Sequence, residues 1–293
     1  MSLYDYQVFN TVVQQGSFNK ASRILHVTPS AVSHIIAKLE DDFGFPLLFR
    51  NRTGISLTPD GEKMLPSIQE LLSCSEQLNQ EISELNGIMD GTVRIAAFSS
   101  VACSWLPHII KKFKDEHPQV TVNILQGSYG EIEEWLRTDA VDLAFVTGVF
   151  RPTDEIDVIP LTSDRMMCAL PKYFKTRSKK YVTTEEIAGE IIIHSSSNSE
   201  NEIYEYVEKH DLHTGYEYVF DDDNAKLAMV EQELGVCILP ELILKNKPYD
   251  IKALPLKPAA ERSICLAVAH AKFTAPATQE LKNHIIEYVT SIK

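Results

Sequence analysis

Apolar residues in the first sixty positions recur at the spacing of three short amphipathic helices. The first predicted helix stops at Gly16, and Ser17 can cap the second. The third begins at Thr28, because a threonine cap followed by Pro29 is a strong start signal, and it ends at Gly44. The inward faces would hold Phe9, Val12 and Val13; Ala21, Ile24 and Leu25; and Val32, Ile35, Ile36, Leu39 and Phe43. Two helices joined by a tight turn form a helix-turn-helix.

The outward face of the third helix carries groups suited to the major groove of DNA: short hydroxyls, one imidazole and one ammonium. Residues 50–54 form a basic tight turn ahead of the extended segment 55–57, which predicts a wing hairpin whose arginines reach phosphates or the minor groove. Each of these residues taken singly is as readily a solvated surface group, and their joint placement favours the DNA-binding interpretation. The predicted DNA-binding residues are Thr28, Pro29, Ser30, Ser33, His34, Lys38, Arg50, Arg52 and Thr53.

A long helix is predicted to follow from Thr58 and Pro59, which repeat the start signal. Its apolar residues are spaced alternately by four and three, interrupted only by Ser75, and a helix bearing such a heptad seam needs a partner. The helix would extend on the order of 45 Å, and a second copy of the chain is the economical partner. The predicted dimerisation residues are Met64, Ile68, Leu71, Leu78, Ile82 and Leu85.

From Thr92 onward the pattern changes to alternating strands and helices. One helix would be capped by Ser99 and Ser100 and closed by Pro118, and the last would cover residues 276–291. This is an α/β layout, and we expect two lobes with a cleft between them. The predicted strands are 93–97, 120–124, 143–146, 165–170, 191–193, 216–220, 236–239 and 264–268.

The composition and the absence of certain motifs mainly exclude classes of protein and kinds of site. The net charge is −13, yet residues 1–60 are neutral, so charge alone does not indicate a nucleic-acid partner. No apolar stretch is long enough to cross a bilayer and no basic-then-apolar leader is present, which predicts a cytoplasmic protein without membrane contact. Five widely spaced cysteines without a CxxC or Cys/His cluster predict neither a disulfide framework nor a metal site. No GxSxG, P-loop, GxGxxG or HExxH motif occurs, so we expect no cofactor and no enzyme.

The N-terminal segment resembles the LysR family of transcription regulators. The matching residues are Phe9, Val12, Gly16–Phe18, Ala21–Ser22, Leu25, Val27–Thr28, Ser30–Ser33, Ile36, Leu39–Glu40, Gly44, Pro46–Leu47, Arg50, Leu57–Pro59 and Gly61. The remainder is similar, more loosely, to the effector domain of that family, through Trp105–Pro107, Phe113, His117–Pro118, Gly127, Asp142–Ala144, Gly235–Val236 and Ile238–Pro240. Many members have Gln in place of Pro29 and Arg in place of His34, so base preference cannot be transferred.

The resemblance implies a fold of the multidomain α+β and α/β class, and a homodimer or homotetramer that binds promoter DNA and changes its grip when a small molecule enters the C-terminal cleft. The predicted parts are a winged helix-turn-helix at 1–58, a linker and dimerisation helix at 59–90, and a two-lobed effector-binding domain at 91–293, which resembles periplasmic binding proteins. Its first lobe would comprise about 91–161 and 267–293, and its second about 162–266.

The effector site is expected beyond the carboxyl ends of the strands, where hydroxyls and helix N-termini favour a small anion. The predicted effector-binding residues are Ser99, Ser100, Gly127, Ser128, Thr147, Gly148, His194 and Ser195. Two observations leave this open: the serines are equally well ordinary helix caps, and the acidic tract Asp221–Asp223 would repel an anion unless it caps the next helix.

The runner-up hypothesis is a redox sensor of the same family acting through cysteines. No local feature marks Cys103, Cys168, Cys237 or Cys265 as a reactive thiol, and the last three lie in apolar strand-like segments. A solute-binding protein is a further alternative, which the N-terminal helix-turn-helix disfavours.

Overall fold

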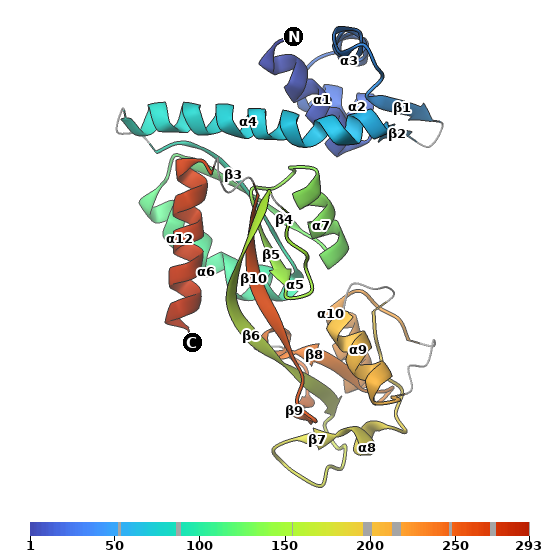
Figure 1. Cartoon of the computed structure of the whole chain (residues 1–293). Coiled ribbons are helices and arrows are strands. Elements are labelled where there is room, and N and C mark those ends of the chain that lie inside the picture. The colour runs from blue at the N-terminus through green and yellow to red at the C-terminus, as the bar shows by residue number, and fades with distance from the viewer. Residues whose placement is uncertain are drawn as a thin grey trace.

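The computed structural model describes the chain except for residues 52–53, 86–88, 154, 196–200, 213–217, 246–247, 270–273 and 293, and it describes the backbone alone for residues 51, 84 and 201. An N-terminal domain lies across one end of the molecule, and a C-terminal domain of two successive lobes extends away from it (Figure 1). The long helix α4 runs between the N-terminal domain and the first of these lobes (Figure 1). Among the described residues, no helix is both long and apolar enough to span a membrane.

Three helices, a hairpin and the start of α4 build the N-terminal domain, and local signals set the ends of these helices. Ser2 and Asp5 form a capping box at the start of α1, and Gly16 ends that helix in the left-handed conformation, with φ of 59°. Ser17 caps α2, and Thr28 caps α3. The elements are α1 (Leu3–Gln15), α2 (Phe18–Ile24), α3 (Pro29–Phe43), β1 (Leu48–Asn51), β2 (Gly54–Leu57) and α4 (Pro59–Leu85).

The core of the N-terminal domain contains the predicted apolar faces of α1 and α3, with one error in α2. Ile24 was predicted to face inward, but 54% of it is exposed, because it is the last residue of a helix of only two turns. The first turns of α4 complete the core through Leu65 and Ile68. Gly61 allows this close packing, since a Cβ there would lie 2.2 Å from the carbonyl oxygen of Leu47.

The first lobe surrounds the parallel strands β3, β4 and β5, whose apolar side chains pack against helices. Strand β5 is buried at all five positions, as expected for a strand covered on both faces. The helix predicted to run from Ser99 to Pro118 is in fact two helices, because the chain turns at Trp105. The elements are β3 (Gly91–Ala97), α5 (Ser99–Ser104), α6 (Leu106–Glu116), β4 (Val120–Gln126), α7 (Tyr129–Arg137), β5 (Leu143–Thr147) and α12 (Pro276–Ser291).

Two long antiparallel strands, β6 (Ile156–Pro171) and β10 (Glu261–Ala269), connect the lobes (Figure 1). The strand order is β4-β3-β5-β10-β6-β9-β7, with β8 also paired to β6. Ile156 and Leu161 of β6 pack in the first lobe, whereas Met166 and Cys168 pack in the second. Strand β10 enters the core of the first lobe at Ile264, three residues before the predicted boundary at 267.

The second lobe is smaller and less regular. The predicted strands at 191–193 and 216–220 appear only as single bridges, Ile192 to Val236 and His194 to Val219, and residues 216–217 lie outside the described part of the chain. Asp222 caps α10, so the acidic tract does supply a helix cap. The elements are β7 (Val182–Thr183), α8 (Thr184–Ile187), α9 (Asn201–Lys209), α10 (Asp223–Glu231), β8 (Cys237–Pro240), α11 (Glu241–Leu244) and β9 (Ile251–Lys257).

Candidate DNA-binding and effector-binding sites

The side of α3 that faces away from the core presents the predicted polar surface. Thr28, Pro29, Ser30, His34 and Lys38 are exposed, and Ser33 is half-buried. The Thr28 hydroxyl accepts a hydrogen bond from the backbone N–H of Ala31 and lies 3.0 Å from the Ser30 hydroxyl, so the first turn of α3 is firmly closed. The apolar residues of α3 face the core, which leaves this polar strip as the outward side of a rigid helix.

Arg50 on the wing folds back toward α3. Its guanidinium donates to the Ser33 hydroxyl at 3.3 Å, lies 3.9 Å from a carboxylate oxygen of Glu40, and stacks 4.9 Å from the centroid of Phe18. Glu40 in turn accepts hydrogen bonds from the N–H groups of Leu47 and Leu48, at the base of the wing. The wing and the recognition surface therefore form one unit. The other two predicted wing residues, Arg52 and Thr53, lie outside the described residues.

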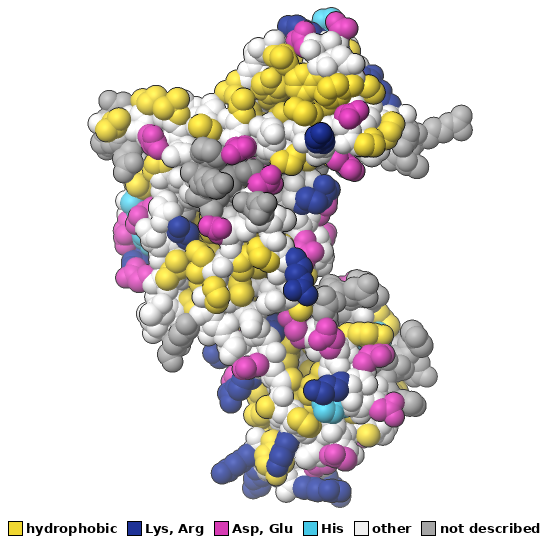
Figure 2. All heavy atoms as spheres, viewed as in Figure 1, with side chains coloured by type: hydrophobic (Ala, Val, Ile, Leu, Met, Phe, Trp, Pro, Cys, Tyr) yellow, Lys and Arg dark blue, Asp and Glu magenta, His cyan; other side chains and the backbone are white. Residues whose placement is uncertain are grey.

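The predicted seam on α4 divides into two parts. Ile68 is buried in the core of its own N-terminal domain, and Met64 packs against that core and is partly buried. The remaining members are exposed, to 45%, 56%, 50% and 89% for Leu71, Leu78, Ile82 and Leu85. Figure 2 shows hydrophobic side chains on the molecular surface along α4. This four-residue stripe is an apolar face that a single chain leaves uncovered.

The cleft between the lobes is organised by a buried arginine that the sequence analysis missed. Arg262 of β10 is 2% exposed and donates to Asp164 at 2.8 Å and 3.2 Å, to the Ser100 hydroxyl at 2.6 Å and to the Tyr129 hydroxyl at 2.7 Å. Its guanidinium also stacks 4.8 Å from the centroid of Phe98. Burial alone lowers the pKa of Arg262, but Tyr129 and Asp164 more than offset burial, so the pKa is raised and the group stays charged. A lone arginine at the start of the apolar run of β10 was the available signal.

Two hollows, of about 360 Å³ and about 1010 Å³, open between the lobes, and the smaller one reaches Arg262. Ser99, Ser100 and Gln126 line both from the first lobe, and Asp221 and Asp223 line both from the second. The smaller hollow also takes in Ser128, Glu131, Ser195 and Arg262. The wall from the first lobe therefore presents hydroxyls, the Arg262 guanidinium and the Glu131 carboxylate, and the wall from the second lobe presents the carboxylates of Asp221 and Asp223.

A buried lysine fixes the wall of the second lobe. Lys226 of α10 is 1% exposed, and its ammonium donates to the Ser195 hydroxyl at 2.7 Å and to Asp223 at 3.1 Å. A lysine inside a helix between Ala225 and Leu227 was the sequence signal for this group, and it too went unnoticed. Each buried cation at the cleft is thus matched by a carboxylate, and the exposed Asp221 and Asp222 place two further carboxylates on this wall.

The structure separates the predicted effector residues into two groups. Ser99, Ser100, Gly127, Ser128 and Ser195 line the hollows, whereas Thr147, Gly148 and His194 line neither. Gly127 has a packing role, because a Cβ there would lie 2.6 Å from the Trp135 ring. Ser128 is an ordinary cap of α7, since the Glu131 carboxylate occupies the helix N-terminus by accepting from the Ser128 N–H and hydroxyl, both at 2.8 Å.

The cysteines do not form a reactive site in the described structure. Cys168, Cys237 and Cys265 are buried, and burial raises the pKa of Cys168 and of Cys265. A raised pKa disfavours the thiolate, which is the form that reacts with oxidants. Cys103 is exposed and lines the larger hollow.

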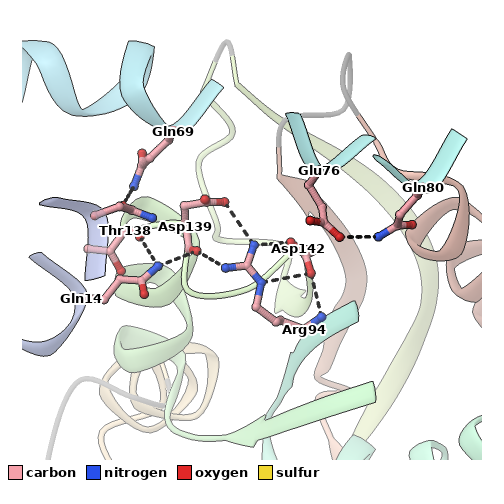
Figure 3. Close-up of polar contacts among 9 residues, drawn as sticks. Gln14, Gln69, Glu76, Gln80, Arg94, Thr138, Asp139 and Asp142 are labelled. Atoms are coloured by element: carbon pink, nitrogen blue, oxygen red, sulfur yellow. Dashed lines mark hydrogen bonds and ion pairs between the residues drawn. The ribbon is translucent and has the colours of Figure 1, made fainter. Parts of the chain in front are cut away.

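A polar joint connects the N-terminal domain to the first lobe (Figure 3). The side-chain amide of Gln14 on α1 donates to the carbonyls of Thr138 and Asp139, at 3.3 Å and 2.8 Å. These carbonyls lie just beyond the C-terminus of α7, where backbone acceptors lack partners within the helix. Arg94 on β3 donates to the same Asp139 carbonyl at 2.7 Å and is paired with Asp142. Gln14 and Arg94 therefore meet at one acceptor, which links helix α1 to the sheet.

Asp139 within this joint makes stability depend on pH. Burial raises its pKa to about 7; the attraction of Arg94 offsets burial only in part, and repulsion from Asp142 raises the pKa further. Because the folded-state pKa exceeds the unfolded value of about 3.9, the folded state binds the proton more tightly, and this stabilisation is lost as the pH rises from about 4 to about 7. We expect the wild-type melting temperature to fall more between pH 5 and pH 8 than that of Asp139→Asn, which retains a residue tolerated at the observed φ of 53°. Equal slopes for the two proteins would contradict this assignment.

Comparison with known proteins gives the class to which these sites belong. Residues 3–62 match the model of the bacterial regulatory helix-turn-helix proteins of the LysR family, and residues 87–290 match the LysR substrate binding domain. The chain therefore belongs to the LysR family: it is a transcriptional regulator, not an enzyme, with a helix-turn-helix DNA-binding domain and an effector-binding domain. Regulators of this family bind DNA and effectors and form oligomers.

Individual relatives match almost the whole chain, but at low sequence identity. An uncharacterised transcriptional regulator of Bacillus subtilis, YvbU, is 27% identical over 275 residues, which are 93% of each chain. A full-length single-residue variant of OxyR from Pseudomonas aeruginosa has a TM-score of 0.77 at 20% identity and covers 99% of this chain and 97% of its own. Full-length CbnR, solved with its target DNA, has a TM-score of 0.56 at 19% identity, with coverage of 99% and 100%. At these identities the solved structures establish the shared fold.

Proposed function

We propose that two copies of this chain, joined along the exposed stripe of α4, bind paired half-sites in promoter DNA and change their grip when an effector enters the cleft between the lobes. The observation that carries the proposal is the joint at Gln14, because it connects the domain that bears α3 directly to the lobe that forms one wall of the cleft. Promoter binding places this activity in the cytoplasm. A two-fold dimer predicts half-sites separated by one or more helical turns, about 34–36 Å each.

The outward surface of α3 is assigned to the major groove and Arg50 to the adjoining backbone. Ser30, Ser33 and His34 are close to the helix N-terminus, which is the part of a recognition helix that meets base edges. Arg50 is half-exposed and held near Ser33, from where its guanidinium can exchange a weak protein contact for a phosphate. A domain without net charge can still bind phosphates when its few cations share one face. Lys38 lies on α3, the helix against which Arg50 folds.

The effector is assigned as a small molecule with an anionic group and, opposite it, a cationic group. The hydroxyls of Ser99 and Ser100, which accept from Gln126 and Arg262, can each donate to a carboxylate. Asp221, Asp222 and Asp223 make the facing wall acidic although Asp223 is paired with Lys226, so this wall would repel a simple anion and attract an ammonium group. The structure therefore favours a zwitterion, such as an amino acid, over the simple anion expected from the sequence. Sensing through cysteines receives no support from the buried thiols described above.

Footprinting of the full-length protein on the DNA upstream of its own gene tests this function. The ligand panel contains α-amino acids, the matching carboxylic acids without the amine, and the matching amines without the carboxylate. We expect a two-fold-symmetric protected region whose length or bend changes with one amino acid and with neither of its matched partners. His34→Ala should weaken binding to that site about tenfold, corresponding to one lost base contact, while the response to the ligand is retained.

Three results would count against parts of the proposal. A change in the footprint with the carboxylic acid alone would indicate that the effector is a simple anion. A change caused by peroxide and abolished by Cys103→Ser would support the redox alternative. Selection from random DNA that recovers no common sequence would contradict specific DNA binding by this chain.

A further inference from the structure

The first lobe contains a cluster of imidazole and carboxylate groups that the regulatory function does not use. Glu116 and His117 end helix α6, and His284 lies on α12, which packs beside α6 (Figure 1). One ligand atom from each of these three residues lies within 4.8 Å of the others. His284 is 168 positions from Glu116 in the sequence, which is why the sequence analysis predicted no metal site.

The hydrogen bonds of His284 fix its ring in the orientation of a metal ligand. Its Nδ1 atom lies 3.0 Å from the backbone carbonyl oxygen of Glu280, one turn earlier on α12, so Nδ1 carries the hydrogen. In the neutral ring this leaves the lone pair on Nε2, which faces a carboxylate oxygen of Glu116 at 3.1 Å. Two lone pairs at that distance repel unless a positive centre lies between them. A histidine that donates Nδ1–H to a carbonyl and turns Nε2 outward is the common arrangement around bound metal ions.

The surroundings favour a dication at this point. His284 is 5% exposed, and its ring packs edge-on against Phe113 and 5.8 Å from the ring of His117. Glu280 adds a second carboxylate, 3.9 Å from Nε2 of His117. The two carboxylates give the neutral-histidine cluster a charge of about −2. The neighbouring Lys112 ammonium is paired mainly with Glu287, at 2.8 Å, and its attraction to Glu116 is weaker.

We propose that Glu116, His117 and His284 form a binding site for a divalent transition-metal ion, with Glu280 as the adjacent carboxylate. Imidazole and carboxylate ligands suit Zn²⁺ and its neighbours, and bond lengths of about 2.0–2.2 Å place tetrahedral ligand atoms about 3.3–3.5 Å apart. The 3.1 Å separation of His284 and Glu116 is already close to this, and the exposed Glu116 can move to complete the site. The ion would tie the end of α6 to α12, whose first turn donates from the Ala277 N–H to Gln80 of α4.

The test uses the full-length protein, freed of metal by a chelator and then titrated with Zn²⁺ and Co²⁺. We expect one ion per chain, a rise in melting temperature, and a Co²⁺ visible spectrum without the strong thiolate charge-transfer band. Glu116→Gln and His117→Ala change exposed or half-buried groups, so they should fold normally, and each should weaken binding at least tenfold. His108→Ala, an exposed histidine on the same helix outside the cluster, is the matched control and should bind as the wild type does.

Several results would overturn the proposal. The first is that the wild type does not bind Zn²⁺ at micromolar concentration. The second is that Glu116→Gln and His117→Ala bind Zn²⁺ as tightly as the wild type, and the third is that Cys74→Ser or Cys103→Ser abolishes binding. The first of these would mean that a proton, as an imidazolium at His284, occupies the position between the two groups.

Discussion

Arg262→Met is expected to destabilise the effector-binding domain by about 3–5 kcal/mol, because it leaves the carboxylate of Asp164 buried without a counter-charge. Asp164 is 9% exposed, and beyond the ion pair it accepts a hydrogen bond from the N–H of Leu242. The substitution also removes the hydrogen bonds to Ser100 and Tyr129 that hold α5 and α7 at the cleft. Urea unfolding followed by circular dichroism measures the loss, and effector binding should disappear with it.

Two matched variants separate a lost ion pair from a general effect of removing an arginine. Arg165→Met removes another arginine, which is 61% exposed and paired with Glu241, and should cost less than about 1 kcal/mol. The double variant Arg262→Met with Asp164→Asn should recover most of the stability, because no buried charge remains. If Arg262→Met lowered the free energy of unfolding no more than Arg165→Met does, the ion pair of Arg262 and Asp164 would not be what holds the cleft together.

The double substitution Leu78→Glu and Ile82→Glu is expected to convert the proposed dimer into a monomer. Both residues lie in the exposed stripe of α4, about half of each is accessible in one chain, and facing glutamates from two copies would repel. Loss of the second half-site contact should lower affinity for the paired operator by about 100-fold, since linked sites gain that much from effective concentration. Sedimentation velocity measures the mass, and gel-shift titration measures the affinity.

Glu70→Lys controls for a charge change on the same helix, because Glu70 is exposed but lies off the stripe. This variant should remain dimeric. The circular dichroism of the double variant should match that of the wild type, because neither residue belongs to the core of the chain. A dimer that survives both glutamates would show that the stripe is not the interface, and the apolar face of α4 would need another partner.

The sequence by itself determined the elements whose signals are local. Thr28 and Pro29 begin α3, Gly16 ends α1, and Ser128 caps α7, because caps and glycine stops act within one helical turn. The short apolar strand β5 was equally clear, since a continuous apolar run predicts a strand covered on both faces. The family motif spans contiguous residues of the N-terminal domain, so it too could be recognised without a fold.

The tertiary structure alone decided which residues meet across long separations. Arg262 meets Ser100 and Asp164, Gln14 meets Asp139, and His284 meets Glu116, and none of these pairs shares a periodicity that a sequence displays. The structure also divided the heptad seam, because Ile68 and, in part, Met64 bury their apolar surface within their own domain while Leu71 to Leu85 do not. An apolar pattern states that a residue needs burial, and only the packed chain shows what buries it.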